Sequence, residues 1–282
     1  PDFVSAVQLD VVGFVGAVGL CLFGLVSLGS GWALIHPPGS PRSLLARRFL
    51  MAQPAKYIPG GVSMPVSQVA LSKEYDSSTA SSVARLITHS AMMVCGGLLA
   101  GSAMMLEPSQ RSLGAVCLLG GAIGSVWILI ADVASVINGL TDRLRRFKPT
   151  RSLPRLADLQ LPRTAKAAAL LACFVGMTAL AAAFPLLGRT NPDLPGYAGL
   201  MGAFAFAWTV GFLAIPFPAG AGVREGALAL ASSDSATFGT LLALALLHRV
   251  AMLAAETVGL VASALSDRVT AGRTRRRDSE PG

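Results

Sequence analysis

Charged residues are scarce in this chain of 282 residues, at 13% of the total, whereas hydrophobic residues make up 53%. Soluble globular domains carry about a quarter charged residues, so the composition nearly excludes an ordinary cytosolic enzyme. Aromatic residues are also few, at 6%, which argues against a stacking surface for single-stranded nucleic acid. We therefore expect a membrane protein with no nucleic-acid partner.

The sequence also lacks the short motifs of metal, redox and nucleotide chemistry. No two of the four cysteines are spaced as C-x-x-C, and all four lie inside apolar runs, so they read as packed apolar residues. They are Cys21, Cys95, Cys117 and Cys173. No phosphate loop, H-E-x-x-H or G-x-S-x-G motif occurs. The sequence thus predicts no catalytic residue, no cofactor and no metal site.

Long apolar runs, in contrast, are abundant, and five of them reach the roughly 20 residues that a bilayer span needs. These predicted spans are Val11–Ile35, Ser78–Leu106, Ser112–Leu140, Ala165–Leu187 and Ala236–Leu265. Two further apolar stretches, Ser43–Ser72 and Tyr197–Ala231, are interrupted by proline and glycine. The expected fold is therefore an all-α integral membrane protein with about five full spans and two broken helical hairpins.

Basic residues outnumber acidic residues by 23 to 15, and their positions predict the topology. The segments 36–73, 141–166 and 267–282 hold five, eight and five of them, so 18 of the 23 lie in three segments. Because cytoplasmic loops are rich in Lys and Arg, these segments and the C-terminus are expected in the cytoplasm. The first broken hairpin then starts and finishes inside, which predicts a re-entrant hairpin. The second starts and finishes outside, as a re-entrant hairpin or as one span with a short return helix.

The two hairpins also suggest an internal repeat. A shift of 159 residues aligns Pro59 with Pro218, Gly61 with Gly220 and His89 with His248. Three crossings separate the hairpins, so the second unit is inverted relative to the first, as in many transporters. The expected organisation is a first unit with its connecting span (1–140), a basic cytoplasmic loop (141–166), a second unit (167–265) and a basic disordered tail (266–282).

Several residues within the spans have expected packing roles. The motifs Gly97-x-x-x-Gly101 and Gly120-x-x-x-Gly124 predict close packing of the second and third spans. Arg85 is expected to extend to the cytoplasmic surface. Asp132 lies near the cytoplasmic end of the third predicted span, where we expect it to be solvated.

Each proline-glycine break predicts a short helix that begins near Val62 or Val223. The N-terminus of a helix inside the membrane attracts a phosphate or carboxylate group, and Lys56 and Arg224 lie close to the two breaks in sequence. The pattern therefore indicates a site for an anionic headgroup. The alternative is that proline and glycine only let the helices turn and pack.

Arg249 lies near the middle of the last span, where a charge is costly and usually functional. Glu225 is its expected partner, and Glu256, seven residues further on, shares its helix face and is the alternative partner. The pair could also be a structural link between the hairpin and the last span, and Glu225 could instead favour the dipole of its own helix. His89 and His248 are expected to pack through hydrogen bonds, with proton relay as the alternative.

The residues at the breaks resemble those of a known family. The motifs are Lys56-Tyr57-Ile58-Pro59-Gly60-Gly61, Pro216-Phe217-Pro218-Ala219-Gly220-Ala221-Gly222-Val223-Arg224-Glu225, the pair His248-Arg249, and Trp32 before the first hairpin. They resemble the lysylphosphatidylglycerol synthase transmembrane-region family, the flippase-like membrane proteins, from about Val11 to Leu265. The resemblance implies a lipid flippase fold without the soluble synthase domain of the best-understood relatives. Members of this family usually have a further span before the one at Val11, and since Pro1 rather than Met is the first residue, we expect that span to be missing from this sequence.

The resemblance therefore implies a flippase in the cytoplasmic (inner) membrane that moves a phosphate-bearing lipid. The lipid would be a phospholipid, an aminoacyl-phospholipid or a polyprenyl-phosphate-linked lipid. The alternatives are a non-transporting scaffold for a separate glycosyltransferase or lipid synthase, and a membrane transferase with Glu225 or His248 as base. The expected binding or translocation residues are Lys56, Tyr57, Pro59, Gly60, Gly61, Gln68, Pro218, Gly220, Gly222, Arg224, Glu225, His248, Arg249 and Glu256.

Overall fold

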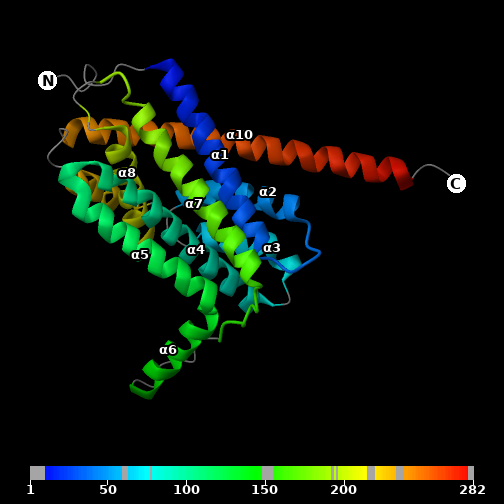
Figure 1. Ribbon diagram of the computed structural model, residues 1–282. Coiled ribbons are helices and arrows are strands. Elements are labelled where there is room, and N and C mark those ends of the chain that lie inside the picture. The colour runs from blue at the N-terminus through cyan, green and yellow to red at the C-terminus, as the bar shows by residue number, and fades with distance from the viewer. Residues whose placement is uncertain are drawn as a thin grey trace.

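The computed structural model describes residues 10–58, 63–76, 78–147, 155–191, 194, 196–214, 220–232 and 238–278, and no β-strand occurs among them. The elements, with 3₁₀ helices written η, are α1 (Val11–Leu34), α2 (Arg42–Ala52), η1 (Gln53–Tyr57), α3 (Ser63–Ser72), η2 (Lys73–Tyr75), α4 (Thr79–Gly101), η3 (Ser102–Leu106), η4 (Pro108–Gln110), α5 (Arg111–Ile130), α6 (Val133–Phe147), α7 (Arg163–Leu186), α8 (Tyr197–Leu213), α9 (Val223–Ala231) and α10 (Phe238–Asp278). Their arrangement is shown in Figure 1.

Five helical segments are long and apolar enough to cross a membrane, which confirms the predicted number. They are Val11–Leu34, Thr79–Leu106, Pro108–Ile130, Arg163–Leu186 and Phe238–Ser266. The two broken stretches form shorter helices, α2 with η1 and α3 in the first hairpin, and α8 with α9 in the second. This arrangement is that of a multi-pass, all-helical membrane protein.

The structure corrects the predicted end of the third span. Helix α5 ends at Ile130 rather than at Leu140, and α6 begins at Val133 as a separate helix. Asp132 is the reason for the break, because its carboxylate accepts hydrogen bonds from the backbone N–H of Ala134 at 3.2 Å and of Leu159 at 3.2 Å. Asp132 is therefore an N-terminal cap of α6 and not simply a solvated residue.

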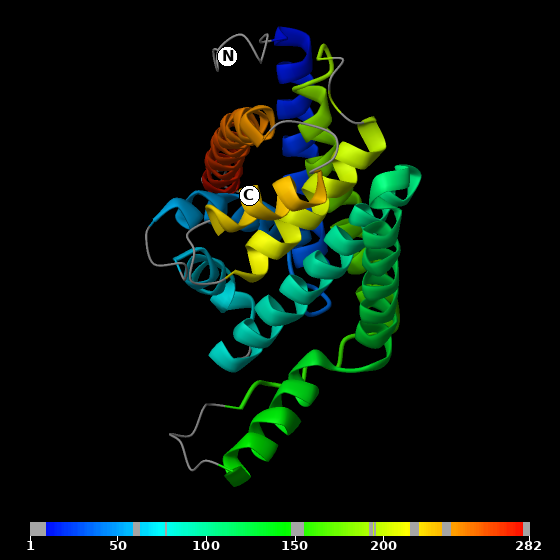
Figure 2. The same cartoon turned by 90° about the vertical axis from the view of Figure 1, so that its left-hand side faces the viewer.

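The C-terminal segment also differs from the expected disordered tail. Helix α10 continues without interruption to Asp278, well beyond the apolar part that ends at Ser266. In Figure 1 this long helix runs across α1 rather than alongside it, and Figure 2 shows it nearly along its axis. At the crossing, Cys21 Sγ of α1 lies 3.8 Å from His248 Nε2 of α10.

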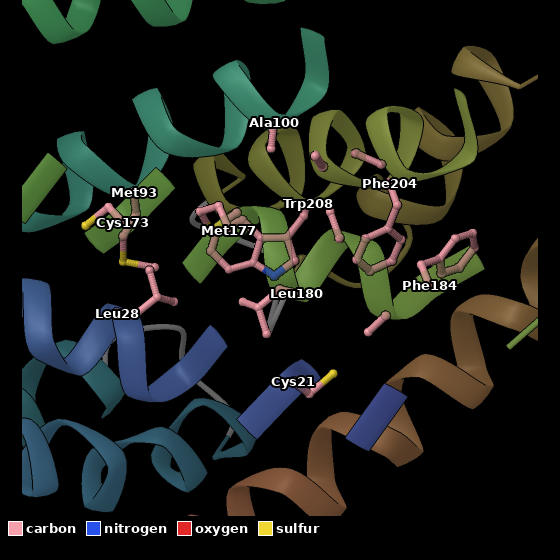
Figure 3. Packing of buried hydrophobic residues seen from close by; sticks show 14 of the residues in the cluster. Cys21, Leu28, Met93, Ala100, Cys173, Met177, Leu180, Phe184, Phe204 and Trp208 are labelled. Carbon is pink, nitrogen blue, oxygen red and sulfur yellow. The ribbon is translucent and has the colours of Figure 1, made fainter. Parts of the chain in front are cut away.

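Helix α7 is the centre of the bundle and packs between α1 and α4. Figure 3 shows its side chains Cys173, Met177, Leu180 and Phe184 between residues of α1 on one side and of α4 and α8 on the other. These four α7 side chains are all at most 1% exposed. The apolar core of the protein therefore forms around α7.

Glycine lets α1 and α7 approach at backbone distance. A Cβ atom added to Gly24 would lie 2.9 Å from the carbonyl oxygen of Gly176, and one added to Gly176 would lie 2.9 Å from that of Gly24. On the opposite side of α7, a Cβ on Gly96 of α4 would lie 2.9 Å from the Cys173 carbonyl. Small residues at such contacts are how membrane helices gain packing without a hydrophobic driving force.

Three of the four glycines predicted to pack α4 against α5 lie at this contact: added Cβ atoms would lie 2.7 Å from Cys95 Sγ for Gly124, 3.5 Å from Leu98 Cδ1 for Gly120 and 3.4 Å from Cys117 Sγ for Gly101. Gly114 and Gly121, which were not predicted, bring the backbones close, because their added Cβ atoms would lie 2.5 Å from the Met105 N and 2.9 Å from the Leu99 N. Gly97 instead faces Thr209 of α8. The small-xxx-small spacing identified an interface helix correctly, but the spacing itself does not show which neighbour each glycine meets.

An ion pair outside the spans holds the start of α1 to the segment after α7. The Asp10 carboxylate accepts a hydrogen bond from the Val12 N–H at 3.1 Å, which caps α1, and it pairs with Arg189. The hydrogen bond from Arg189 lowers the pKa of the Asp10 carboxyl below its usual value. The cap therefore stays ionised at neutral pH.

We predict that Gly24→Ala destabilises the protein by about 1–3 kcal/mol, as overpacking of a tight contact does. The added methyl group would overlap the backbone of α7, which has no room to move between α1 and α4. The matched control is Gly19→Ala on the same helix, where an added Cβ meets no atom within 4 Å. Thermal unfolding of the purified proteins in one detergent measures both, and equal midpoints for the two variants would contradict the prediction.

Candidate functional site

A cavity of about 440 Å³ lies between the two broken hairpins. The first hairpin contributes residues of η1 and α3, the second contributes residues of α8, α9 and the segment before α9, and α4 and α10 supply further walls. Most of the lining is apolar. The polar and aromatic lining residues are Gln53, Lys56, Tyr57, Gln68, His89, Ser90, Trp208, Phe212, Arg224, His248 and Arg249.

Three basic side chains line this cavity, and no acidic residue is among its described lining residues. Lys56 comes from η1, Arg224 from α9 and Arg249 from α10, so residues nearly 200 positions apart in the chain meet here. The guanidinium of Arg224 lies over the indole of Trp208, with Cζ 5.8 Å from the ring centroid. Such stacking fixes the position of a guanidinium against an aromatic ring.

Two glutamates that are not among the described lining residues pair with two of the three cations. Arg249 Nη2 donates to Glu225 Oε1 at 2.6 Å, which confirms the predicted pair. Lys56 donates to Glu256 Oε1. Helix α10 therefore carries one member of each pair and links to both hairpins.

The alternative pairing of Arg249 with Glu256 is wrong. The seven residues between them correspond to about two helical turns, or roughly 10 Å along the axis. Glu256 is only 3% exposed, and Lys56 reaches it from the first hairpin. With three basic and two acidic side chains, the group around the cavity keeps one positive charge in excess.

Local chain geometry explains the glycines of the second break. Gly220 and Gly222 have φ angles of +67° and +80°, which favour glycine strongly. A Cβ on Gly220 would also lie 2.6 Å from the carbonyl oxygen of Gly211 in α8. The Glu225 carboxylate accepts a hydrogen bond from the Gly222 N–H at 2.8 Å and so caps the start of α9. Gly220 and Gly222 thus have a structural role, and Glu225 serves both the cap and the ion pair.

A serine hydrogen bond connects the two sides of the first break. Ser63 Oγ at the start of α3 donates to the carbonyl of Ala55 at 2.7 Å across the interruption. The predicted site residues Pro59, Gly60 and Gly61 in this break, and Pro218 in the second, lie outside the described residues. Gln68 of α3 is 4% exposed and lines the cavity, as predicted from its polar character within an apolar stretch.

The two histidines have packing contacts. His89 Nε2 lies 3.0 Å from the carbonyl oxygen of Leu28 in α1, and His248 Nε2 lies 3.1 Å from that of Leu180 in α7. Both side chains are buried. Each imidazole N–H can donate to its carbonyl, so hydrogen-bonded packing is the role that the geometry favours.

Arg85 differs most from its prediction. Its side chain is 7% exposed, donates to Asp76 Oδ1 at 2.6 Å and donates to the Ile35 carbonyl. It does not extend to the surface, because Asp76 is buried close by and the cost of burying either charge alone is high. This cluster joins the ends of α1 and α4 and contributes nothing to the cavity lining.

Sequence reasoning missed Trp208, Gln53 and Ser90 as lining residues. A tryptophan and a serine are ordinary in apolar helices, and no local pattern distinguishes those that face a cavity. Within the described part of the chain, no group of three or more His, Cys, Asp or Glu residues is placed to hold a metal ion.

Comparison with known proteins identifies no relative: no family model matches the chain, and no curated protein matches it. The resemblance to flippase-like membrane proteins therefore depends on the short sequence motifs alone.

We predict that Lys56→Met destabilises the protein by about 3–5 kcal/mol, because it leaves the buried Glu256 without its partner. The double variant Lys56→Met/Glu256→Leu should recover much of this loss, since it removes both charges. The measurement is a double-mutant cycle of thermal or denaturant unfolding in detergent. If the double variant were less stable than Lys56→Met, the ion pair would not be the source of the effect.

Proposed function

We propose that this protein moves an anionic, phosphate-bearing lipid across the cytoplasmic (inner) membrane, with the headgroup in the cavity between the two hairpins. The observation that carries the proposal is the meeting of Lys56, Arg224 and Arg249 in an otherwise apolar cavity. Cations that line a low-dielectric cavity attract an anion strongly. A charged headgroup needs such a site to leave water, whereas a neutral solute gains little from it.

The rim of the cavity supports a lipid rather than a small soluble anion. Tyr57 and Leu213 both line the cavity and are 40% and 59% exposed, so the cavity reaches the molecular surface at apolar residues. An opening of this kind lets acyl chains stay in the bilayer while the headgroup enters. The exposed Ile58, at 57%, extends the same apolar surface next to Tyr57.

Helix lengths support the re-entrant arrangement of the first hairpin. Helices α2 and α3 have 11 and 10 residues, which at 1.5 Å per residue is about half of the roughly 30 Å hydrocarbon core. Helix α8, with 17 residues, approaches a full span, and α9 has nine. For the second hairpin we therefore propose one near-complete span with a short return helix.

Reciprocal contacts support the inverted repeat. A Cβ on Gly24 would lie 2.8 Å from Leu180 Cγ, and a Cβ on Gly176 would lie 2.8 Å from Leu28 Cγ. The backbone carbonyls of the same two leucines, one in each unit, accept hydrogen bonds from the histidines: Leu180 from His248 and Leu28 from His89. We propose a pseudo-two-fold axis between α1 and α7 that relates the two units, with the cavity between their hairpins.

The predicted topology, with the basic segments and the C-terminus in the cytoplasm, remains part of the proposal. A separate lipid synthase or glycosyltransferase is the proposed source of the lipid. The enzymatic alternative has no supporting observation: Glu225 is held by Arg249 and the Gly222 N–H, and His248 is held by the Leu180 carbonyl.

We predict that the purified protein in liposomes moves fluorescently labelled phosphatidylglycerol between leaflets and that Arg224→Gln slows this movement at least tenfold. A hydrogen bond to a charged group contributes about 1.5–3 kcal/mol, and loss of that energy lowers a rate tenfold or more. Chemical quenching of the label in the outer leaflet measures the rate. Labelled phosphatidylcholine, with no net charge, should move more slowly.

The matched control is Arg111→Gln, which removes a basic side chain outside the cavity. Its transport rate should equal that of the unmodified protein. Equal rates for Arg224→Gln and Arg111→Gln would reject the assigned site. Absence of movement of either lipid by the unmodified protein would favour the non-transporting scaffold.

A further inference from the structure

Helix α6 has an apolar side that the rest of the protein leaves exposed. Val136 and Leu140, one helical turn apart, are 42% and 57% exposed. In the sequence, Leu144 and Phe147 continue the same spacing of three to four residues, which is the pattern of one helix face. Val133 and Ile137, on the adjoining part of the same face, pack on the core. The exposed apolar stripe of α6 therefore has no cover within the described part of the chain.

The same helix is strongly basic. Arg143, Arg145 and Arg146 lie in its second half and Lys148 follows it, against a single acidic residue, Asp142. The Asp142 carboxylate accepts a hydrogen bond from Arg155 at 2.6 Å, which adds a further basic residue beside the helix. A helix with one apolar side and a basic remainder is typical of binding in the interface of an anionic membrane.

The polar side of α6 is fixed to the following segment, which sets the rotation of the helix. The Asn138 side chain both accepts from the Leu156 N–H at 2.9 Å and donates to the Leu156 carbonyl at 2.8 Å. Residue 138 is 160° from residue 140 on a helix with 100° per residue. These two hydrogen bonds therefore hold the side of α6 opposite Leu140 against the segment at Leu156, and Leu140 is directed outward.

The position of α6 places it at a membrane surface. It begins three residues after the last residue of the α5 span, and it extends beyond the end of α5 in both views (Figures 1 and 2). Its 15 residues span about 22 Å. The bilayer into which α5 inserts is thus the apolar phase nearest to the exposed stripe.

We propose that α6 is an interfacial helix that binds anionic phospholipid headgroups, with Val136 and Leu140 in the acyl boundary and the basic residues among the phosphates. This surface lies at the far end of α5 and is separate from the cavity. It anchors the long 141–166 connection to the membrane. Its partner is the lipid surface itself, because an apolar stripe flanked by arginines matches the layered chemistry of that surface.

The test uses the burial of all four native cysteines, which should leave the unmodified protein almost unlabelled. Val136→Cys and, as matched control, Ser135→Cys each take one environment-sensitive fluorophore in the full chain. Ser135 is exposed, and it is 100° from Val136 and 140° from Leu140 on a helix with 100° per residue, so it lies outside the exposed stripe. The labelled proteins are placed in nanodiscs of phosphatidylcholine with or without phosphatidylglycerol.

At position 136 we expect quenching by lipid-attached nitroxide and little quenching by iodide, with the reverse at position 135. Adding phosphatidylglycerol should increase the lipid quenching at 136. Arg143→Gln in the Val136→Cys background should shift the ratio of inserted to uninserted helix about fivefold toward the uninserted form, the effect of one basic residue near an anionic surface.

Two results would overturn the proposal. Equal iodide quenching at both positions, with none from the lipid nitroxide, would place α6 in water. Shielding of position 136 from both quenchers would mean that protein, such as a second copy of the chain, covers the stripe. Size-exclusion profiles that match the unmodified protein establish that each variant is folded.

Discussion

A charge in an apolar environment is stable only beside an opposite charge, and this constraint organises the region around the cavity. Near the cavity, helix α10 contributes the cation Arg249 and the anion Glu256. Each finds its partner on a different hairpin, Glu225 on α9 and Lys56 on η1. The two hairpins have short helices, so these links to α10 position them. The cavity between them depends on both pairs.

Arg224 lines the cavity beside these two pairs and is stacked on Trp208. In the proposed mechanism, an incoming phosphate would contact all three cations and would compete with the glutamates for Lys56 and Arg249. Because the pairs also hold the hairpins, this competition would loosen the hairpins as the anion binds. Binding and movement are thereby coupled through the same side chains in the proposed mechanism.

The packing of α7 provides the rigid part of the molecule. Glycines on α1 and α4 allow its backbone to contact both neighbours, and the reciprocal contacts of Gly24 and Gly176 are made at one point. The two buried histidines bond to backbone carbonyls that flank this point. The structure thus combines a tightly packed centre at α7 with two hairpins of short helices and a basic helix, α6, at one end. This combination fits the proposed lipid carrier that is anchored in its membrane.

The predictions from sequence succeeded where a local pattern has one physical outcome. Low charge and long apolar runs imply membrane spans, and all five were found. The interruption at Gly220 and Gly222 and the start of α9 at Val223 follow from the backbone freedom of glycine. The pair of Arg249 with Glu225 was predicted because a mid-span charge requires a partner. The end of α5 was missed, since an aspartate within an apolar run can be solvated or can cap a new helix.

Composition, periodicity and charge alone therefore determined the all-helical class, the number of spans and the residues that could form a site. Only the tertiary structure decided which charges meet. The sequence argument offered only Arg249 as a partner for Glu256, whereas the approach of the first hairpin places Lys56 beside it. Arg85 reads as a surface residue until the fold places Asp76 beside it. Pairing between distant segments depends on helix packing, and a single sequence does not encode that packing in any local pattern.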